Sequence, residues 1–299
     1  MIQLLMMKKI LVSGLVNIET SLHVDSFPIN YSPIEYPFFG VNSCVSGVGY
    51  NVAKAIKTLG GSVELLSVVG TDLYSNLIKD TLKKEHIGST LLTKIDETPT
   101  SIVLVDNTGR RKIYCDLKNL QDISPIEERE VNLDNCSLAV LTNINFNRQL
   151  LKVLKEKEIV IATDVHVLGD VDDDYNKDFM ENADILFLSN EAIKNREEEF
   201  LKEIYERYHN KIIVCGCGDR GAVMYIGYDD KYYYEESVAP KGIKSTVGAG
   251  DALFSSFIYF YQKGLDLQQC LKNAVLFAGI KISEAGGSNG FVSEEELLK

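Results

Sequence analysis

Residues 245–264 read STVGAGDALFSSFIYFYQKG, and this stretch decides how the rest of the chain is interpreted. The run 252–261 is mostly apolar and predicts a largely buried helix. Gly248, Ala249 and Gly250 therefore stand at the start of that helix. Small residues there let backbone N–H groups approach a ligand, and the helix dipole favours an anion. The sequence thus predicts an anion site at this turn.

Asp251 falls in the first turn of the same helix, beside the expected anion site. A carboxylate repels a phosphate, so its presence makes little sense for anion binding alone. It makes sense if a hydroxyl must lose a proton while it attacks a phosphoryl group. The alternative is a glycine-rich turn in which Asp251 only caps the helix. The stretch matches neither a Walker A loop nor G-x-G-x-x-G, which leaves a Rossmann dinucleotide site with little support.

The rest of the chain alternates short apolar runs with helical patterns. Strands are predicted at 8–13, 63–69, 138–141, 159–163, 185–188 and 212–214, and helices at 48–59, 73–87, 147–156, 176–182 and 192–208. Such alternation is typical of a mostly parallel sheet covered on both faces. Two segments do not fit the rhythm: 22–44 has three prolines and no helical period, and 101–115 predicts a hairpin. They form either a small β-layer that projects as a lid or ordinary surface excursions.

Composition limits the partners of the protein. The formal charge is −12, with 31 Lys and Arg against 43 Asp and Glu. An acidic surface repels phosphates, which argues against a nucleic-acid partner and an anionic membrane. No apolar run reaches the ~18 residues of a membrane span. The six cysteines form no C-x-x-C pair and predict reduced thiols. The start, residues 1–7 followed by Lys8 and Lys9, is too short for a secretory signal. We therefore expect a cytoplasmic protein.

Two segments, 46–72 (SGVGYNVAKAIKTLGGSVELLSVVGTD) and 246–264, resemble the two signatures of the PfkB family of carbohydrate kinases, the ribokinase-like proteins. The resemblance covers nearly the whole chain. It implies an α/β fold, with a Rossmann-like (ribokinase-like) three-layer core, a mostly parallel central sheet and a small β-sheet lid. The implied core comprises 1–16, 45–99 and 119–299, and the implied lid comprises 17–44 and 100–118.

The resemblance also implies ATP as phosphoryl donor, with Mg²⁺. Asp251 resembles the catalytic base of the family. Gly248, Ala249 and Gly250 resemble its anion hole, which stabilises charge on the transferring γ-phosphoryl group. The implied nucleotide contacts are Asn190, Gly218, Arg220, Gly221, Thr246, Asn273 and Phe277. An exposed turn explains Arg220 equally well, and core packing explains Phe277.

The implied contacts with the sugar lie in other parts of the chain. They are Asn17, Glu19, Gly47, Asn51 and Asp164. Asn143 is a further candidate, because it ends a core strand at the expected ligand-binding carboxyl edge of the sheet. Glu19 stands where the family usually has Asp, and a solvated loop acid is its alternative. Asn51 is otherwise a polar residue at a helix start. In the family's D-x-N element the Asn is replaced by His166, whose alternative is a structural or solvated side chain.

Two departures from the family pattern concern the phosphate and the metal. Ser245 replaces the first Asp of D-T-x-G-A-G-D. The N-x-x-E element, which organises Mg²⁺ and phosphate in the family, has Asn190 but Ile193 in place of the Glu. Metal handling is therefore either weaker or differently routed, and no metal ligand is assigned. Neither departure affects Asp251.

The resulting hypothesis is an ATP-dependent sugar kinase that phosphorylates a hydroxyl, expected to be primary, of a small carbohydrate. One alternative is a nucleoside or pseudouridine kinase of the same family, since SGVGYN is similar to their turn. Tyr50, Phe38, Phe39 and Tyr114 would then stack on a base, or else they pack the lid. Another alternative is a non-catalytic sugar-binding protein on the same fold. We expect a homodimer through the apolar segment 36–41 of the lid, unless that segment closes over its own site.

Overall fold

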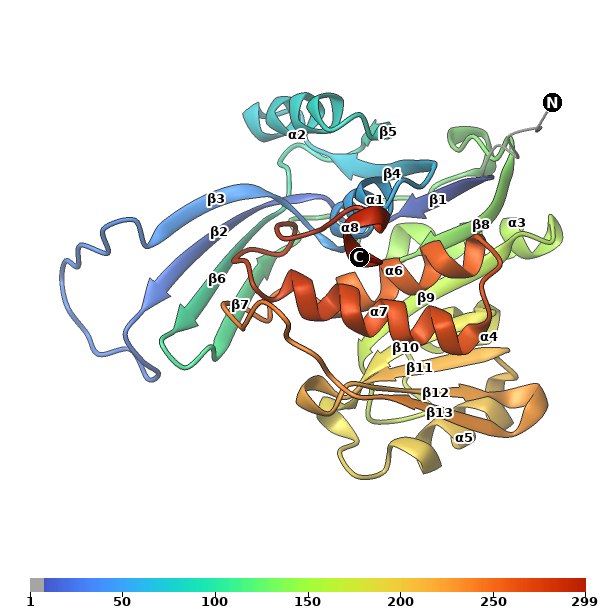
Figure 1. The fold of residues 1–299 in the computed structure, drawn as a ribbon. Helices are drawn as coiled ribbons and strands as arrows, with labels where there is room; N and C mark the ends of the chain where they lie inside the picture. Colours follow the sequence, from blue (N-terminus) through green and yellow to red (C-terminus); the bar gives the residue numbers. More distant parts are fainter. Residues whose placement is uncertain (1–7) are drawn as a thin grey trace.

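A nine-stranded sheet forms the centre of the computed structural model, which describes residues 8–299 (Figure 1). The interpretation of the start at residues 1–7 lies outside these residues. The strand order is β13-β12-β11-β10-β9-β8-β1-β4-β5. The bounds are β1 Lys9–Ser13, β4 Val63–Val69, β5 Gly88–Thr93, β8 Cys136–Leu141, β9 Val160–Val167, β10 Ile185–Ser189, β11 Ile212–Gly216, β12 Ala222–Ile226 and β13 Lys231–Glu235. Strands β11 to β5 pair in parallel, and β12 and β13 add an antiparallel edge.

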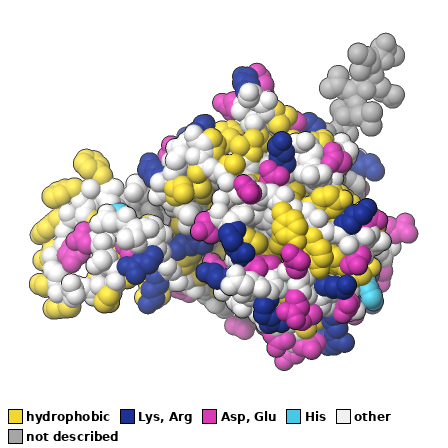
Figure 2. Space-filling view, turned by 60° about the horizontal axis from the view of Figure 1, so that its bottom comes forward, with side chains coloured by type: hydrophobic (Ala, Val, Ile, Leu, Met, Phe, Trp, Pro, Cys, Tyr) yellow, Lys and Arg dark blue, Asp and Glu magenta, His cyan; other side chains and the backbone are white. Residues whose placement is uncertain are grey.

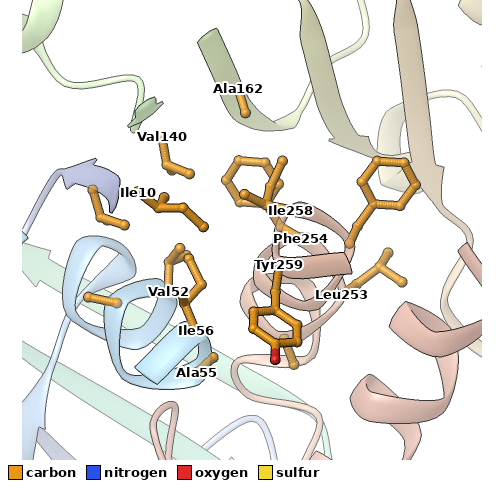
Figure 3. Close-up of a cluster of buried hydrophobic side chains, with 14 of the residues drawn as sticks. Ile10, Val52, Ala55, Ile56, Val140, Ala162, Leu253, Phe254, Ile258 and Tyr259 are labelled. Carbon is orange, nitrogen blue, oxygen red and sulfur yellow. The ribbon is translucent and has the colours of Figure 1, made fainter. Parts of the chain in front are cut away.

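Helices cover both faces of this sheet because successive strand residues point to opposite sides. Ile10 and Val12 contribute to one core, and Leu11 between them contributes to the other. The first core is closed by α1 Val48–Thr58, α2 Leu73–Lys84, α6 Ala249–Gln262, α7 Leu267–Lys281 and α8 Glu294–Leu297, and the second by α3 Arg148–Glu156, α4 Lys177–Asn182 and α5 Glu197–Tyr208. Figure 3 shows strand residues such as Ile10 facing Val52 of α1 and Phe254 of α6.

A second, four-stranded sheet projects from the core (Figure 1). Its order is β3-β2-β6-β7, with β2 Asn17–Val24, β3 Val41–Ser46, β6 Thr100–Asp106 and β7 Arg111–Asp116. Strands β2 and β6 pair in parallel, whereas β2–β3 and β6–β7 are antiparallel. The two segments that did not fit the β–α rhythm thus form one β-layer, and the hairpin prediction for 101–115 is confirmed.

The loop between β2 and β3 carries unusually exposed apolar side chains. Tyr31, Phe38 and Phe39 have 93%, 86% and 100% of their surface exposed. In Figure 2, hydrophobic side chains gather along the free end of the projecting sheet. An apolar patch of this kind commonly marks an interaction surface.

The predicted fold class is confirmed, and the differences are local. The predicted helix 192–208 begins only at Glu197, because 190–192 form a 3₁₀ turn and Asn195 takes a positive φ of 67°. The predicted strand 159–163 continues to Val167. No helix within residues 8–299 combines the length and the apolar character needed to cross a lipid bilayer.

Candidate active site

Two tight glycine turns lie at the candidate site, one before α1 and one before α6. Gly47 has a φ of 103°, and a Cβ on it would lie 2.6 Å from Leu15 O. Gly248 has a φ of 78°, and a Cβ on it would overlap Gly287 O. Both turns require glycine, because an L side chain would meet backbone that cannot move away. The starts of two core helices are thereby held close to neighbouring backbone.

Asp251 lies in the first turn of α6 and is bound by a residue 200 positions earlier. The Nδ2 of Asn51, in α1, donates a hydrogen bond of 2.7 Å to Asp251 Oδ2. Burial raises the pKa of Asp251, against the hydrogen bond from Asn51 and the charge of His166. A carboxylate whose proton affinity is raised and whose position is fixed can act as a proton acceptor.

A buried polar patch leads from Asn51 into the small sheet. Ser46 Oγ donates to Glu19 Oε2 at 2.9 Å, and Ser46 and Asn51 are 3.4 Å apart through Oγ and Oδ1. Glu19 has only 7% of its surface exposed. Asn17 Nδ2 donates to Ser101 Oγ at 3.1 Å, but its buried Oδ1 accepts from nothing within residues 8–299. A buried acceptor without a donor is uncommon, and a ligand hydroxyl would satisfy it.

Asp164 and His166, at the end of β9, add a charged pair close enough to Asp251 to interact with its carboxylate. The backbone N–H of His166 donates to Asp164 Oδ1 at 2.8 Å, and His166 Nδ1 is 3.5 Å from Asp164 Oδ2. Burial lowers the pKa of His166, but the carboxylates of Asp164 and Asp251 outweigh burial and raise it to about 9. Asn143 donates instead to Asn176 at 2.9 Å, so its amide is engaged outside this cluster.

A second cluster forms beyond β10 and β11. Asn190 Nδ2 donates to Glu197 Oε1 at 2.8 Å, and Arg220 forms an ion pair with the same carboxylate. Burial would raise the pKa of Glu197, but these two donors lower it. A cavity of about 300 Å³ adjoins the cluster, lined by Glu197, Glu198, Cys217, Arg220, Ala222, Val223, Tyr234, Glu235 and Glu236. Gly218 and Gly221 belong to the turn that joins β11 to β12 beside it.

Three other predicted nucleotide contacts, Thr246, Asn273 and Phe277, have their side chains engaged with residues outside the Glu197 cluster. Thr246 is exposed, and its Oγ1 accepts a 3.0 Å hydrogen bond from Arg111 of the small sheet. Asn273 is buried and accepts from Gln269 at 2.7 Å. Phe277 has no exposed surface and stacks on Phe291 at 5.6 Å between ring centroids. The geometry of Phe277 favours the packing alternative.

Sequence reasoning missed three charged residues that lie at these clusters. Glu197 follows Asn190 by seven positions, and only the 3₁₀ turn and Asn195 bring the two together. Arg111 reaches Thr246, 135 positions later in the chain, only through the tertiary fold. Lys281 ends α7 with no exposed surface, and its Nζ donates to Gly286 O at 2.7 Å. The run of acids at 197–199 was the one local sequence feature that could have pointed to Glu197. It looks like the acidic residues that commonly begin a helix, so it did not indicate a site.

Comparison with known proteins adds the family. The pfkB family carbohydrate kinase profile matches residues 7–294. The chain belongs to the pfkB family of carbohydrate kinases. As a member it is a phosphotransferase whose acceptor is an alcohol group, and the non-catalytic alternative is set aside.

Individual relatives are distant in sequence but match over most of their length. The acarbose 7(IV)-phosphotransferase of Actinoplanes sp. is 21% identical over 303 residues, covering 97% of each chain. The nucleoside kinase of Methanocaldococcus jannaschii is 23% identical over 272 residues, covering 88% of this chain and 87% of its own. The microbiome-derived acarbose kinase Mak1 has a TM-score of 0.88 at 23% identity, covering 97% of each chain. A Cryptococcus neoformans ribokinase in complex with ADP has a TM-score of 0.76 at 18% identity, covering 97% of this chain and 99% of its own.

Proposed function

We propose that this pfkB kinase transfers the γ-phosphate of ATP to a hydroxyl, expected to be primary, of a small carbohydrate, with Asp251 as the general base. The contact between Asn51 and Asp251 carries the proposal, because it joins a candidate base to a patch suited to hydroxyl groups. The acceptor hydroxyl gives its proton to Asp251 while its oxygen bonds to the γ-phosphorus. The bond from that phosphorus to the β-phosphate oxygen breaks, and ADP leaves.

The patch from Asn17 to Asn51 fits a polyhydroxylated ligand. The carboxylate of Glu19 can accept from sugar hydroxyls, and Asn17 Oδ1 lacks a donor within residues 8–299. A sugar hydroxyl that donates to Asn17 would remove the cost of a buried, unpaired acceptor. The similarity to two acarbose kinases supports a carbohydrate acceptor and adds oligosaccharides to the candidates.

The start of α6 fits a phosphate. A Cβ on Gly250 would have no heavy atom within 4 Å, so the space beside this backbone is open. The N–H groups of Gly248, Ala249 and Gly250 lie at the positive end of the helix dipole, where they would stabilise charge on the transferring group. The complex of a related ribokinase with ADP supports ATP as the donor. We place Thr246, Gly218 and Gly221 on the nucleotide side of the site.

The side chains also suit an ion that arrives with the nucleotide. Within residues 8–299, no three His, Cys, Asp or Glu side chains are grouped closely enough to hold a metal ion. Mg²⁺ at phosphoryl-transfer sites keeps several waters and takes one or two carboxylates besides the phosphates. Glu197 would supply the carboxylate through Oε2, because its Oε1 accepts from Asn190 and Arg220, and it would stand in place of the missing N-x-x-E carboxylate. Bound there, Mg²⁺ would neutralise phosphate charge.

The small sheet would serve as a lid and as a dimer surface. Arg111 already bridges it to Thr246, next to the glycine turn. The exposed aromatic loop with Tyr36, Phe38 and Phe39 is suited to a second copy of the same face. We therefore keep the predicted division into a core (1–16, 45–99, 119–299) and a lid (17–44, 100–118), and the homodimer, as proposals.

The test is ADP formation from Mg-ATP with ribose, fructose, hexose phosphates, acarbose, uridine, cytidine, adenosine and pseudouridine. Turnover of a sugar supports the proposal, whereas turnover of nucleosides alone replaces the sugar by the nucleoside alternative. Asp251→Asn should cut kcat by ~10²-fold or more while the acceptor still raises Tm. Near-normal turnover in this variant would remove Asp251 from its role.

A further inference from the structure

Lys281 is an ammonium group inside the protein with no paired carboxylate. Lys281 is the last residue of the core helix α7, and 0% of its surface is exposed. Within residues 8–299, Lys281 Nζ makes a single hydrogen bond, of 2.7 Å to Gly286 O, and takes part in no ion pair. An ammonium buried in this way costs stability, and an apolar side chain of similar length would not. The group therefore calls for a functional explanation.

The carbonyl that Lys281 holds belongs to the loop between α7 and α8. The next residue, Gly287, touches both halves of the candidate site. Its carbonyl oxygen lies against Gly248, and a Cβ on Gly287 would lie 2.9 Å from Asn51 Nδ2 and 3.0 Å from Ser46 Oγ. The loop thus contacts both the glycine turn and the acceptor patch, and the hydrogen bond from Lys281 holds it at Gly286.

Lys281 is also electrostatically linked to the site. Burial lowers its pKa to about 8, while the charges of Asp251 and Glu19 oppose this change. Arg111 of the small sheet lowers the pKa further, and Glu284 of the loop raises it. The two carboxylates that act on it are the candidate base and the acid of the acceptor patch. Lys281 in turn lowers the pKa of Asp251.

We propose that Lys281 is a positioning residue for phosphoryl transfer: its ammonium is an internal cation that holds the loop at 286–287 against Gly248 and stabilises the ionised form of Asp251. The inference rests on the proposed role of Asp251 as base. The lysine touches neither reactant and acts through the loop and through its charge.

The first experiment replaces Lys281 by Met, which keeps the length and removes the charge. We expect Lys281→Met to have a Tm equal to or above that of the wild type, because a buried charge is removed. The acceptor should still raise Tm, kcat should fall roughly 10- to 100-fold, and the acidic limb of the kcat–pH profile should move to higher pH. Lys272→Met, on the exposed side of the same helix, is the matched control and should change none of these. An unchanged kcat and pH profile in Lys281→Met would overturn the proposal.

A second variant separates positioning from folding. Lys281→Ala leaves a space in which ammonium can sit, so ammonium chloride should restore part of kcat where tetramethylammonium chloride at equal ionic strength does not. A loss of kcat that follows a loss of Tm, with no rescue by ammonium, would show a merely structural role and contradict the proposal.

A third measurement does not need turnover. Asp251→Asn should raise Tm at pH 7, below the pKa of about 8 of Lys281, more in the Lys281→Met background than in the wild type, because the missing cation makes ionised Asp251 costlier. Additive changes in Tm would refute the electrostatic link whether or not any sugar is a substrate. Failure of the wild type to phosphorylate any acceptor would count against the proposed function, not against this link.

Discussion

Gly250→Ala should make the protein slightly more stable and much less active. Gly250 is the second residue of α6, exposed, and a Cβ on it would have no heavy atom within 4 Å. Alanine in a helix is favoured over glycine by about 0.5–1 kcal/mol, and nothing in the protein opposes the added methyl group. For a chain of 299 residues that gain corresponds to a rise in Tm of about 1–2 °C.

The same methyl group would occupy the space proposed for the transferring phosphoryl group. A displacement of about 1 Å from the reactive position costs on the order of 10²-fold in rate. We therefore expect kcat to fall by roughly 10²-fold, with the KM for the sugar nearly unchanged.

The assay is ADP release at saturating sugar, with Tm measured on the same preparations. Gly88→Ala is the matched control. Gly88 begins β5, at the edge of the core sheet, and is also exposed. A Cβ added to it would make only an ordinary 3.5 Å contact with Val63 O. It should leave kcat unchanged. If Gly250→Ala keeps normal turnover while its Tm rises, the phosphate does not lie at this turn, and the reasoning fails at its main step.

Four further predictions concern the titrating groups and the lid. Glu197→Gln should raise the KM for ATP about tenfold and leave the KM for the sugar unchanged, as steady-state kinetics with each substrate varied would check. Because burial raises the pKa of Asp251, kcat should rise with pH through that raised pKa, and a limb near the ordinary value of 3.8 would contradict the assignment. The stability of the protein should change with pH in the opposite direction to kcat, because ionised Asp251 is destabilising. The rise in Tm caused by Asp251→Asn should therefore grow with pH and vanish below the unfolded-state pKa. The double variant Phe38→Ser, Phe39→Ser should shift a dimer to monomer in sedimentation without lowering Tm, and an unchanged dimer would place the interface elsewhere.

The parts of the site that the sequence could predict depend on local spacing. The turn at Gly248 and the helix after it could be inferred because a run of small residues directly precedes a long apolar run. The small sheet could be suspected because 22–44 and 101–115 break the β–α alternation. The pairing of β2 with β6, however, joins segments about 80 residues apart, and no local pattern specifies it.

The charged residues that were missed depend on tertiary geometry. A lysine in the last turn of a helix ordinarily binds the final carbonyls or faces water, and its sequence position gives no sign that Lys281 is buried. Glu197 was hidden by the assumption that the helix begins near 192. Strand β13 was missed because its tyrosine-rich run is half exposed, so its apolar residues do not alternate cleanly.

The arrangement of charge explains why such a site must be assembled from distant segments. Asp251 and Lys281 have pKa values moved toward neutrality from opposite sides by burial, and each stabilises the charged form of the other. Burial makes the carboxylate a better proton acceptor, whereas the cation keeps it ionised long enough to serve as one. Neither effect helps folding, since both groups would cost less as apolar residues. The stability that tolerates them comes from the two apolar cores on either side of the sheet, and the loop at 286–287 is where that rigid frame meets the reacting groups.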